Sequence, residues 1–171
     1  MENAASNFSH ALDRVLFREG GYVNDPLDLG GETKFGISKK AYPWLDIANL
    51  SLEDARAIYK RDYWDKLRLD ELQHAEIAEK IFDVAVNMGP RAAIVILQQA
   101  LNLLVGATGR SPLQVDGLMG PATLNAANQW CRKDFDSLQK ALRGFQFMRY
   151  AEIVKDRPDQ ARFARGWIRR V

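Results

Sequence analysis

The first clear pattern in the chain is an amphipathic repeat close to its start. Apolar residues recur at helical spacing from Phe8 through Leu12 to Leu16. The pattern stops at the Gly20-Gly21 pair, and glycine is a common helix terminator. The sequence therefore predicts an amphipathic helix over residues 8–19.

The next segment, residues 22–38, has a different character. It reads YVNDPLDLGGETKFGIS, in which Asn-Asp-Pro, Asp-Leu-Gly-Gly and Phe-Gly separate short pieces with β propensity. This spacing predicts a small irregular hairpin or a structured loop.

Helical periodicity then fills most of the remaining chain. Capping residues, glycine stops and prolines delimit the expected helices. These helices are Ser51 to about Trp64 with Asp54 in a capping box, 77–88 before Gly89-Pro90, about 90–105, Pro121 to Trp130, and Asp134 to about Lys155 before Arg157-Pro158. The expected fold is mostly α, with one small β element between the first two helices.

The junction at Gly89-Pro90 joins two apolar helices without a flexible spacer. We therefore expect a part over residues 1–89 and a helical part over residues 90–171, packed on each other around a shared core.

Composition fits a compact globular protein. The chain has 171 residues, 47% of them hydrophobic, and a formal net charge of +2. No stretch reaches the roughly 18 to 20 apolar residues of a membrane span, and the start lacks the features of a signal peptide, so we expect synthesis in the cytoplasm without an export signal. A single cysteine, Cys131, excludes an intramolecular disulfide.

Positive charge is concentrated near the C-terminus. Residues 131–171 hold 11 of the 24 Lys and Arg residues but 5 of the 22 Asp and Glu residues. Such a segment favours anionic polymers, although the same residues also fit the solvated face of a helix.

Glu19 is the residue whose position is most informative for chemistry. It lies three, four and seven residues after Leu16, Val15 and Leu12, on the apolar face of the predicted helix. Burial and the C-terminal end of a helix dipole both raise a carboxyl pKa, which is what a general acid requires. The alternative is a helix-end residue that forms an ion pair with a lysine.

One reaction that uses a general acid of this kind is the hydrolysis of a glycan. It also requires a second carboxylate in a more polar environment. Asp25 and Asp28 both lie in the glycine-rich segment, and Asp28 has few apolar neighbours, so it should remain ionised. Thr33 could hold the attacking water. The alternative is that both aspartates only form turns through bonds to the backbone.

Three segments form a recognisable set: REGGYVNDPLDLGGETKFGI at 18–37, YKRDYWDKL at 59–67 and DVAVNMG at 83–89. Together they resemble glycoside hydrolase family 108, muramidases found among phage endolysins and secretion-associated enzymes of prophage origin. LQQALN at 97–102, VDGLMGPATLNA at 115–126 and GWIRR at 166–170 resemble the predicted peptidoglycan-binding region that usually accompanies the family.

This resemblance implies an α+β, lysozyme-like fold, with residues 1–89 catalytic and residues 90–171 of the peptidoglycan-binding type. It implies cleavage of the β-1,4 bond between N-acetylmuramic acid and N-acetylglucosamine, without metal or cofactor. Glu19 matches the catalytic acid of the EGGY motif. The order of Glu19, Asp28 and Thr33 matches the phage-lysozyme pattern, which favours Asp28 over Asp25 as the second carboxylate.

Four further residues are candidates for substrate binding. Tyr22, Tyr42 and Trp64 could line a sugar groove, because aromatic faces pack on pyranose rings, or could equally belong to the core. Asn87 could bind an N-acetyl group, or could cap the end of its helix.

Other classes of enzyme find little support. His10 and His74 belong to no zinc-binding motif, and the sequence places no histidine as a catalytic partner of Cys131.

The expected partner is the peptidoglycan glycan strand, bound by a monomer in the periplasm, with no nucleic acid and no stable membrane insertion. The remaining alternatives are a lytic transglycosylase, which Asp28 and Thr33 disfavour, and a non-catalytic wall-binding protein that assists secretion.

Overall fold

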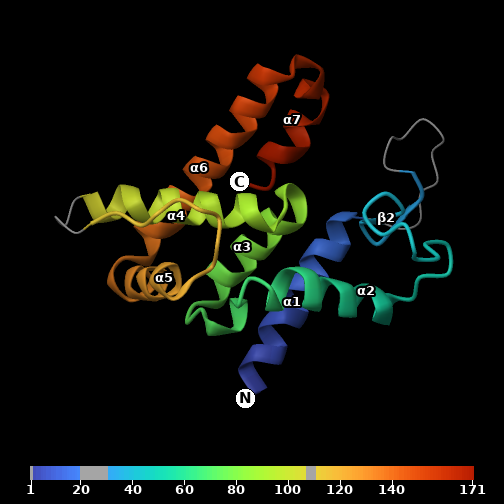
Figure 1. The fold of residues 1–171 in the computed structure, drawn as a ribbon, viewed down its shortest axis with the longest axis horizontal. Helices are drawn as coiled ribbons and strands as arrows, with labels where there is room; N and C mark the ends of the chain where they lie inside the picture. Colours follow the sequence, from blue (N-terminus) through green and yellow to red (C-terminus); the bar gives the residue numbers. More distant parts are fainter. Residues whose placement is uncertain (1, 20–30, 107–110) are drawn as a thin grey trace. The chain divides into compact units, whose positions relative to one another are not determined.

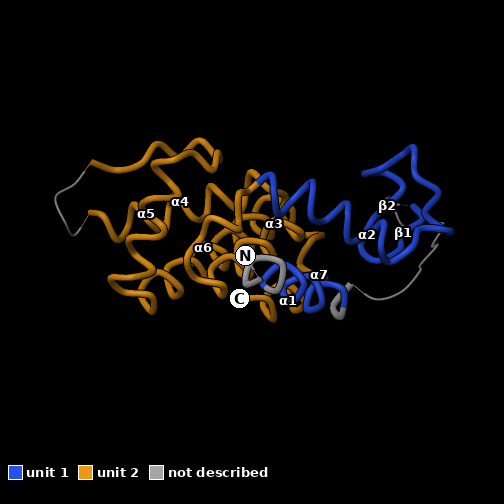
Figure 2. The backbone as a smooth tube through the Cα atoms, turned by 90° about the horizontal axis from the view of Figure 1, so that it is seen from below, with its two compact units in different colours: residues 1–66 blue, residues 67–171 orange. Residues whose placement is uncertain are grey.

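The computed structural model of the chain describes residues 2–19, 31–106 and 111–171, and leaves the side chains of residues 2–6 and 17–19 undescribed. The chain forms two compact units, Met1–Lys66 and Leu67–Val171, which are coloured separately in Figure 2. Each unit is described by itself. No helix in the described parts is long and apolar enough to cross a membrane.

The first unit begins with α1 (Glu2–Glu19), which ends at the residue that the sequence predicted (Figure 1). Phe8, Leu12 and Val15 are buried along one face of this helix, as their helical spacing requires. The helix begins at Glu2, several residues before the predicted start at Phe8. The sequence did not indicate this first part because it carries no apolar repeat.

The predicted hairpin consists of two short antiparallel strands, β1 (Thr33–Lys34) and β2 (Ile37–Ser38). Thr33 pairs with Ser38 and Lys34 pairs with Ile37, which leaves Phe35 and Gly36 as the two turn residues. Both turn residues have positive φ, 54° and 76°, as the tight turns of two-residue hairpins require.

The hairpin also fixes the irregular segment that follows it. Lys34 donates a 2.8 Å hydrogen bond to the carbonyl oxygen of Ala48, and Lys39 donates a 2.5 Å bond to that of Leu45. Ile47 is fully buried beneath this segment. Two lysines thus satisfy carbonyl groups that have no partner in a helix or sheet.

The helix that follows is α2 (Leu52–Tyr59), which continues as a π-helical turn over Lys60–Asp65. The predicted capping box is present: the Ser51 hydroxyl accepts from the amide of Asp54, and the Asp54 carboxylate accepts from the amide of Ser51. The helical segment therefore reaches Trp64 as expected, but its second half is wound more loosely than an α-helix.

The second unit is entirely helical apart from its connecting segments. Its α-helices are α3 (Ala75–Met88), α4 (Pro90–Gly106), α5 (Pro121–Lys133), α6 (Phe135–Asp156) and α7 (Ala161–Ile168), with 3-10 turns at Leu69–Glu71 and Pro158–Gln160. α4 packs against α3, α5 and α6, so it forms the centre of the unit. Ile94, Leu97 and Leu101 on α4 are fully buried. The functional division at residues 89 and 90 stays a prediction.

α7 was not predicted, although the break at Arg157 and Pro158 was. Figure 1 shows α7 returning beside α6, and the rings of Trp167 and Tyr150 stack with their centroids 5.2 Å apart. The last residues bind α3: Lys80 donates to the carbonyl oxygen of Arg170, and Arg170 forms a 3.1 Å ion pair with the buried Asp83. One member of the basic tail is therefore structural.

A buried glutamine holds the extended segment between α4 and α5. Gln98, which is 1% exposed, donates to the Asp116 carboxylate at 2.8 Å and accepts from the amide of Gly117 at 2.9 Å. One turn further along α4, Asn102 makes two hydrogen bonds to the backbone of Leu113. These side chains bind backbone groups of Leu113 and Gly117 that lie outside any helix or strand.

Candidate functional site

Glu19 is the last residue of α1, and its backbone continues the register of the helix. Leu12 and Val15, which precede it by seven and four residues, are both buried. The position is therefore the one expected from the sequence, although the Glu19 side chain itself lies outside the description. Tyr22, Asp25 and Asp28 also lie outside the described residues.

Thr33 is the first residue of β1 and is half-buried. Its hydroxyl donates a 3.2 Å hydrogen bond to the carbonyl oxygen of Gly31. This bond uses the hydroxyl proton and leaves the oxygen lone pairs as acceptors. The residue is thus fixed at the base of the hairpin, at the end of the segment that carries Asp28.

Tyr42 belongs to a polar cluster beside α2. Its hydroxyl donates to the Asp62 carboxylate at 2.9 Å, and the Arg61 guanidinium donates to both oxygens of that carboxylate, at 2.6 and 2.7 Å. Burial and the bond to Asp62 raise the pKa of Tyr42 well above its ordinary value. The bond from Arg61 lowers the pKa of Asp62. Tyr42 therefore stays protonated and acts as a donor at neutral pH.

Trp44 is an aromatic residue beside this cluster that the sequence analysis did not select. Its side chain is 75% exposed, and its ring meets the ring of Tyr42 edge to face, with centroids 5.8 Å apart. Trp44 directly follows Pro43, outside every element expected from the sequence, and this position was the available signal. An exposed indole of this kind offers a flat surface for a sugar ring.

Trp64, in contrast, belongs to the core, which was the second of its two predicted roles. It is 1% exposed and packs edge to face against Phe8, with ring centroids 5.4 Å apart. In this structure its indole offers no face to a sugar. Its contact with α1 instead supports the helix that ends at Glu19.

Asn87 lies in the last turn of α3, in the second unit. Its side-chain carbonyl oxygen accepts a 2.9 Å hydrogen bond from the hydroxyl of Tyr150. The end of α3 is instead closed by Gly89, whose amide binds the carbonyl oxygen of Ala85. The amide group of Asn87 is therefore held by α6 and does not cap its own helix.

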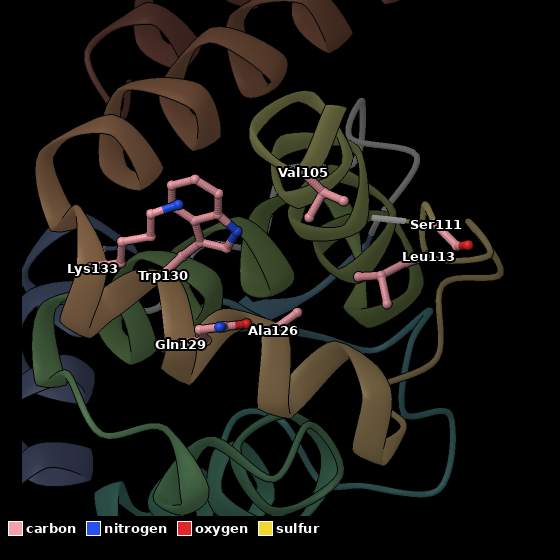
Figure 3. Close-up of a pocket in the computed structure, with 7 residues that line it drawn as sticks. All are labelled: Val105, Ser111, Leu113, Ala126, Gln129, Trp130 and Lys133. Atoms are coloured by element: carbon pink, nitrogen blue, oxygen red, sulfur yellow. The ribbon is translucent and has the colours of Figure 1, made fainter. Parts of the chain in front are cut away.

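A hollow of 330 Å³ lies in the second unit, between α4, α5 and the segment that begins at Ser111. Figure 3 shows the side chains that line it. The Lys133 ammonium lies 4.5 Å from the centre of the Trp130 ring, and both residues line the hollow. The other lining residues are Val105, Ser111, Leu113, Ala126 and Gln129. Nearby, burial raises the pKa of the Cys131 thiol, which disfavours its use as a nucleophile.

Comparison with known proteins gives two family matches that together span most of the chain. Residues 12–89 match the family described as Glycosyl hydrolase 108, and residues 92–171 match the family described as Predicted Peptidoglycan domain. Among solved structures, SagA of Brucella abortus is similar, with 28% sequence identity and a TM-score of 0.75, over 97% of this chain and 90% of that one. No protein of curated function matches.

Proposed function

Because residues 12–89 belong to the glycosyl hydrolase 108 family and residues 92–171 to the predicted peptidoglycan domain, we propose that this peptidoglycan hydrolase is an N-acetylmuramidase of the lysozyme type. It would cleave the β-1,4 bond between N-acetylmuramic acid and N-acetylglucosamine. The observation that carries this proposal is the position of Glu19 at the end of α1, in register with a buried apolar face.

Glu19 serves as the general acid. A carboxyl group beside apolar side chains and at the C-terminal end of a helix loses stability when charged, so it retains its proton near neutral pH. It gives that proton to the glycosidic oxygen as the bond to the anomeric carbon breaks. Trp64 supports Glu19 only indirectly, by packing against Phe8 of the same helix.

Asp28 is the second carboxylate, and Thr33 assists it. Asp28 positions the water that attacks the anomeric carbon, while the Thr33 hydroxyl oxygen, whose proton is bound to Gly31, accepts a hydrogen bond from that water. The separation of the two carboxyl groups determines whether the configuration of the sugar is inverted or retained.

The substrate contacts we propose in the first unit are aromatic side chains. The exposed Trp44 and the half-buried Tyr42 supply an aromatic pair in the first unit, and Tyr22 adds a third ring from the segment after α1. The N-acetyl contact predicted for Asn87 is not part of this proposal, because its side chain lines a hollow of the second unit. The enzyme acts on the wall in the periplasm, in a phage-derived or prophage-derived setting.

The test is the chemistry of the released products. Purified peptidoglycan digested with the protein should give fragments with reducing N-acetylmuramic acid ends, identified by mass spectrometry after borohydride reduction. A Glu19→Gln protein should release none above background. Fragments that end in 1,6-anhydro-muramic acid would identify a transglycosylase, and binding without release would identify a wall-binding protein.

A further inference from the structure

A second hollow of the Leu67–Val171 unit lies between the end of α3 and the α6–α7 pair. Its volume is 310 Å³, enough for a group the size of one amino acid. The polar and aromatic residues that line it are Asn87, Arg149, Tyr150, Arg157, Gln160 and Trp167. It is separate from the hollow beside Trp130 and shares no lining residue with it.

A chain of hydrogen bonds fixes the orientation of Asn87 at this hollow. The fully buried Gln146 donates from its side-chain amide to the hydroxyl of Tyr150 at 3.1 Å, and that hydroxyl donates to the carbonyl oxygen of Asn87 at 2.9 Å. Because the Asn87 oxygen accepts this bond, its NH₂ group remains to donate to a ligand.

The charged lining residues are all positive. Arg149 and Arg157 both line the hollow, and no aspartate or glutamate does. Arg149 forms a 3.2 Å ion pair with Glu152, whereas Arg157 has no ion pair among the described residues. Two guanidinium groups and one amide NH₂ therefore favour an anionic ligand that accepts hydrogen bonds.

We propose that this hollow binds a carboxylate of the peptide stems of peptidoglycan. The inference rests on the proposed function, which makes the wall polymer the substrate; the stems are its anionic part. The Arg157 guanidinium binds the carboxylate through two parallel hydrogen bonds, and Asn87 donates a further one. The stacked rings of Tyr150 and Trp167 pack against the aliphatic part of the stem residue that carries this carboxylate. The glycan strand is then held through its stem while the first unit acts on the sugars.

Calorimetry with a free stem tetrapeptide that carries no sugar tests the site without requiring catalysis. The full chain should bind the peptide, and Arg157→Gln should weaken binding by about 10-fold or more, since a charge-assisted pair is lost. Arg165→Gln is the matched control, because Arg165 is exposed on α7, does not line the hollow and loses the same charge. The same peptide with its carboxylates amidated should not bind.

Each other result has a definite meaning. If Arg157→Gln and Arg165→Gln weaken the binding of the peptide equally, the effect is general electrostatic attraction by the positive charge of the protein, and the proposal is overturned. Binding of inorganic phosphate but not of the peptide would overturn it as well. If the protein releases reducing sugars yet does not bind the peptide, the site is wrong and the proposed function stands. If it binds the peptide and releases no sugar, the site stands and the proposed function fails.

Discussion

The hydroxyl of Tyr59 donates a 2.9 Å hydrogen bond to the carbonyl oxygen of Phe35, at the tip of the hairpin. Tyr59 is 1% exposed and belongs to the last turn of α2, so the helix holds the turn directly. Phe35 has a φ of 54°, a conformation that non-glycine residues rarely adopt. The same hairpin carries Thr33. The bond from α2 to the turn therefore also helps to fix the position of a predicted catalytic residue.

The first prediction concerns the backbone of this turn. Phe35→Asn and Phe35→Val both remove the aromatic ring, but asparagine tolerates positive φ whereas a β-branched residue does not. The Phe35→Asn protein should be more stable than the Phe35→Val protein by about 1 kcal/mol, although valine is the more hydrophobic residue. Urea denaturation of the two variants measures the difference. Equal stability, or a more stable Phe35→Val protein, would show that the turn is not under this constraint.

The second prediction concerns Gly117, which has a φ of 75°. An added Cβ would lie 2.6 Å from the Arg91 Cγ and 3.1 Å from the Arg91 carbonyl oxygen. Gly117→Ala should therefore lower the free energy of unfolding by about 1 to 3 kcal/mol. Gly144→Ala is the control, because Gly144 lies inside α6 with nothing within 4 Å of an added Cβ. It should raise stability by about 0.5 to 1 kcal/mol. Two shifts of the same sign in thermal denaturation would contradict this explanation.

The third prediction is a pH dependence at Asp116. The bond from Gln98, followed by the bond from the amide of Leu118, lowers the pKa of Asp116 in the folded protein. The unfolded chain has the ordinary value of about 3.9. The resulting stabilisation is present above that pH and is lost as the pH falls through the lowered folded value. Asp116→Asn should thus be less stable than the parent at pH 7, and the gap should shrink towards pH 3. A gap of constant size in denaturation curves would mean that charge plays no part.

The helices could be predicted from sequence because their signals are local. Apolar residues at helical spacing, the Ser51 capping box and the Gly89-Pro90 junction each act within a few residues of their own position. α7 was missed because its apolar residues, Phe163, Trp167 and Ile168, alternate with arginines over only two turns. Its position depends on the contact with Tyr150, which is distant in sequence.

The surroundings of the candidate site were harder to predict for the same reason. The burial of Trp64 depends on Phe8, and the donor role of Tyr42 depends on Asp62, so neither follows from local spacing. Trp44 lies in a segment whose backbone is bound by Lys34 and Lys39, and these contacts do not follow from local spacing either. The backbone position of Glu19 at the end of α1 could be predicted from local spacing, while its catalytic role stays a prediction.

The fourth prediction concerns a fragment that ends at Gly89. In the full chain α3 packs against α4, and Ile77, Ile81 and Phe82 are buried. The fragment keeps α3 but lacks α4, so it exposes these residues and should be poorly soluble or lack cooperative unfolding. Calorimetry and activity assays on the fragment provide the test. A sharp melting transition with full activity would show that residues 1–89 form an independent catalytic domain, and would contradict a shared core.

The last prediction tests the mechanism through Glu19. If Glu19 is a desolvated acid, Glu19→Gln should lower the rate by about 10² to 10⁴, the usual contribution of a general acid. Glutamine has the same shape and removes an unfavourable carboxyl, so the melting temperature should hold or rise. If Glu19 instead forms a structural ion pair, the change leaves a cation without its partner and costs about 3 to 5 kcal/mol if that pair is buried. The two roles thus predict opposite changes in stability, which calorimetry can separate.

The aspartates complete this test, because they should respond unequally. Asp28→Asn should reduce the rate strongly, since a neutral amide cannot position and activate the attacking water, while Asp25→Asn should matter less. Rates of release of reducing ends from peptidoglycan measure both. An Asp25→Asn protein without activity, beside an active Asp28→Asn protein, would identify Asp25 as the second carboxylate and leave Glu19 as the acid. A Glu19→Gln protein with full activity would remove the acid itself, and with it the proposed mechanism.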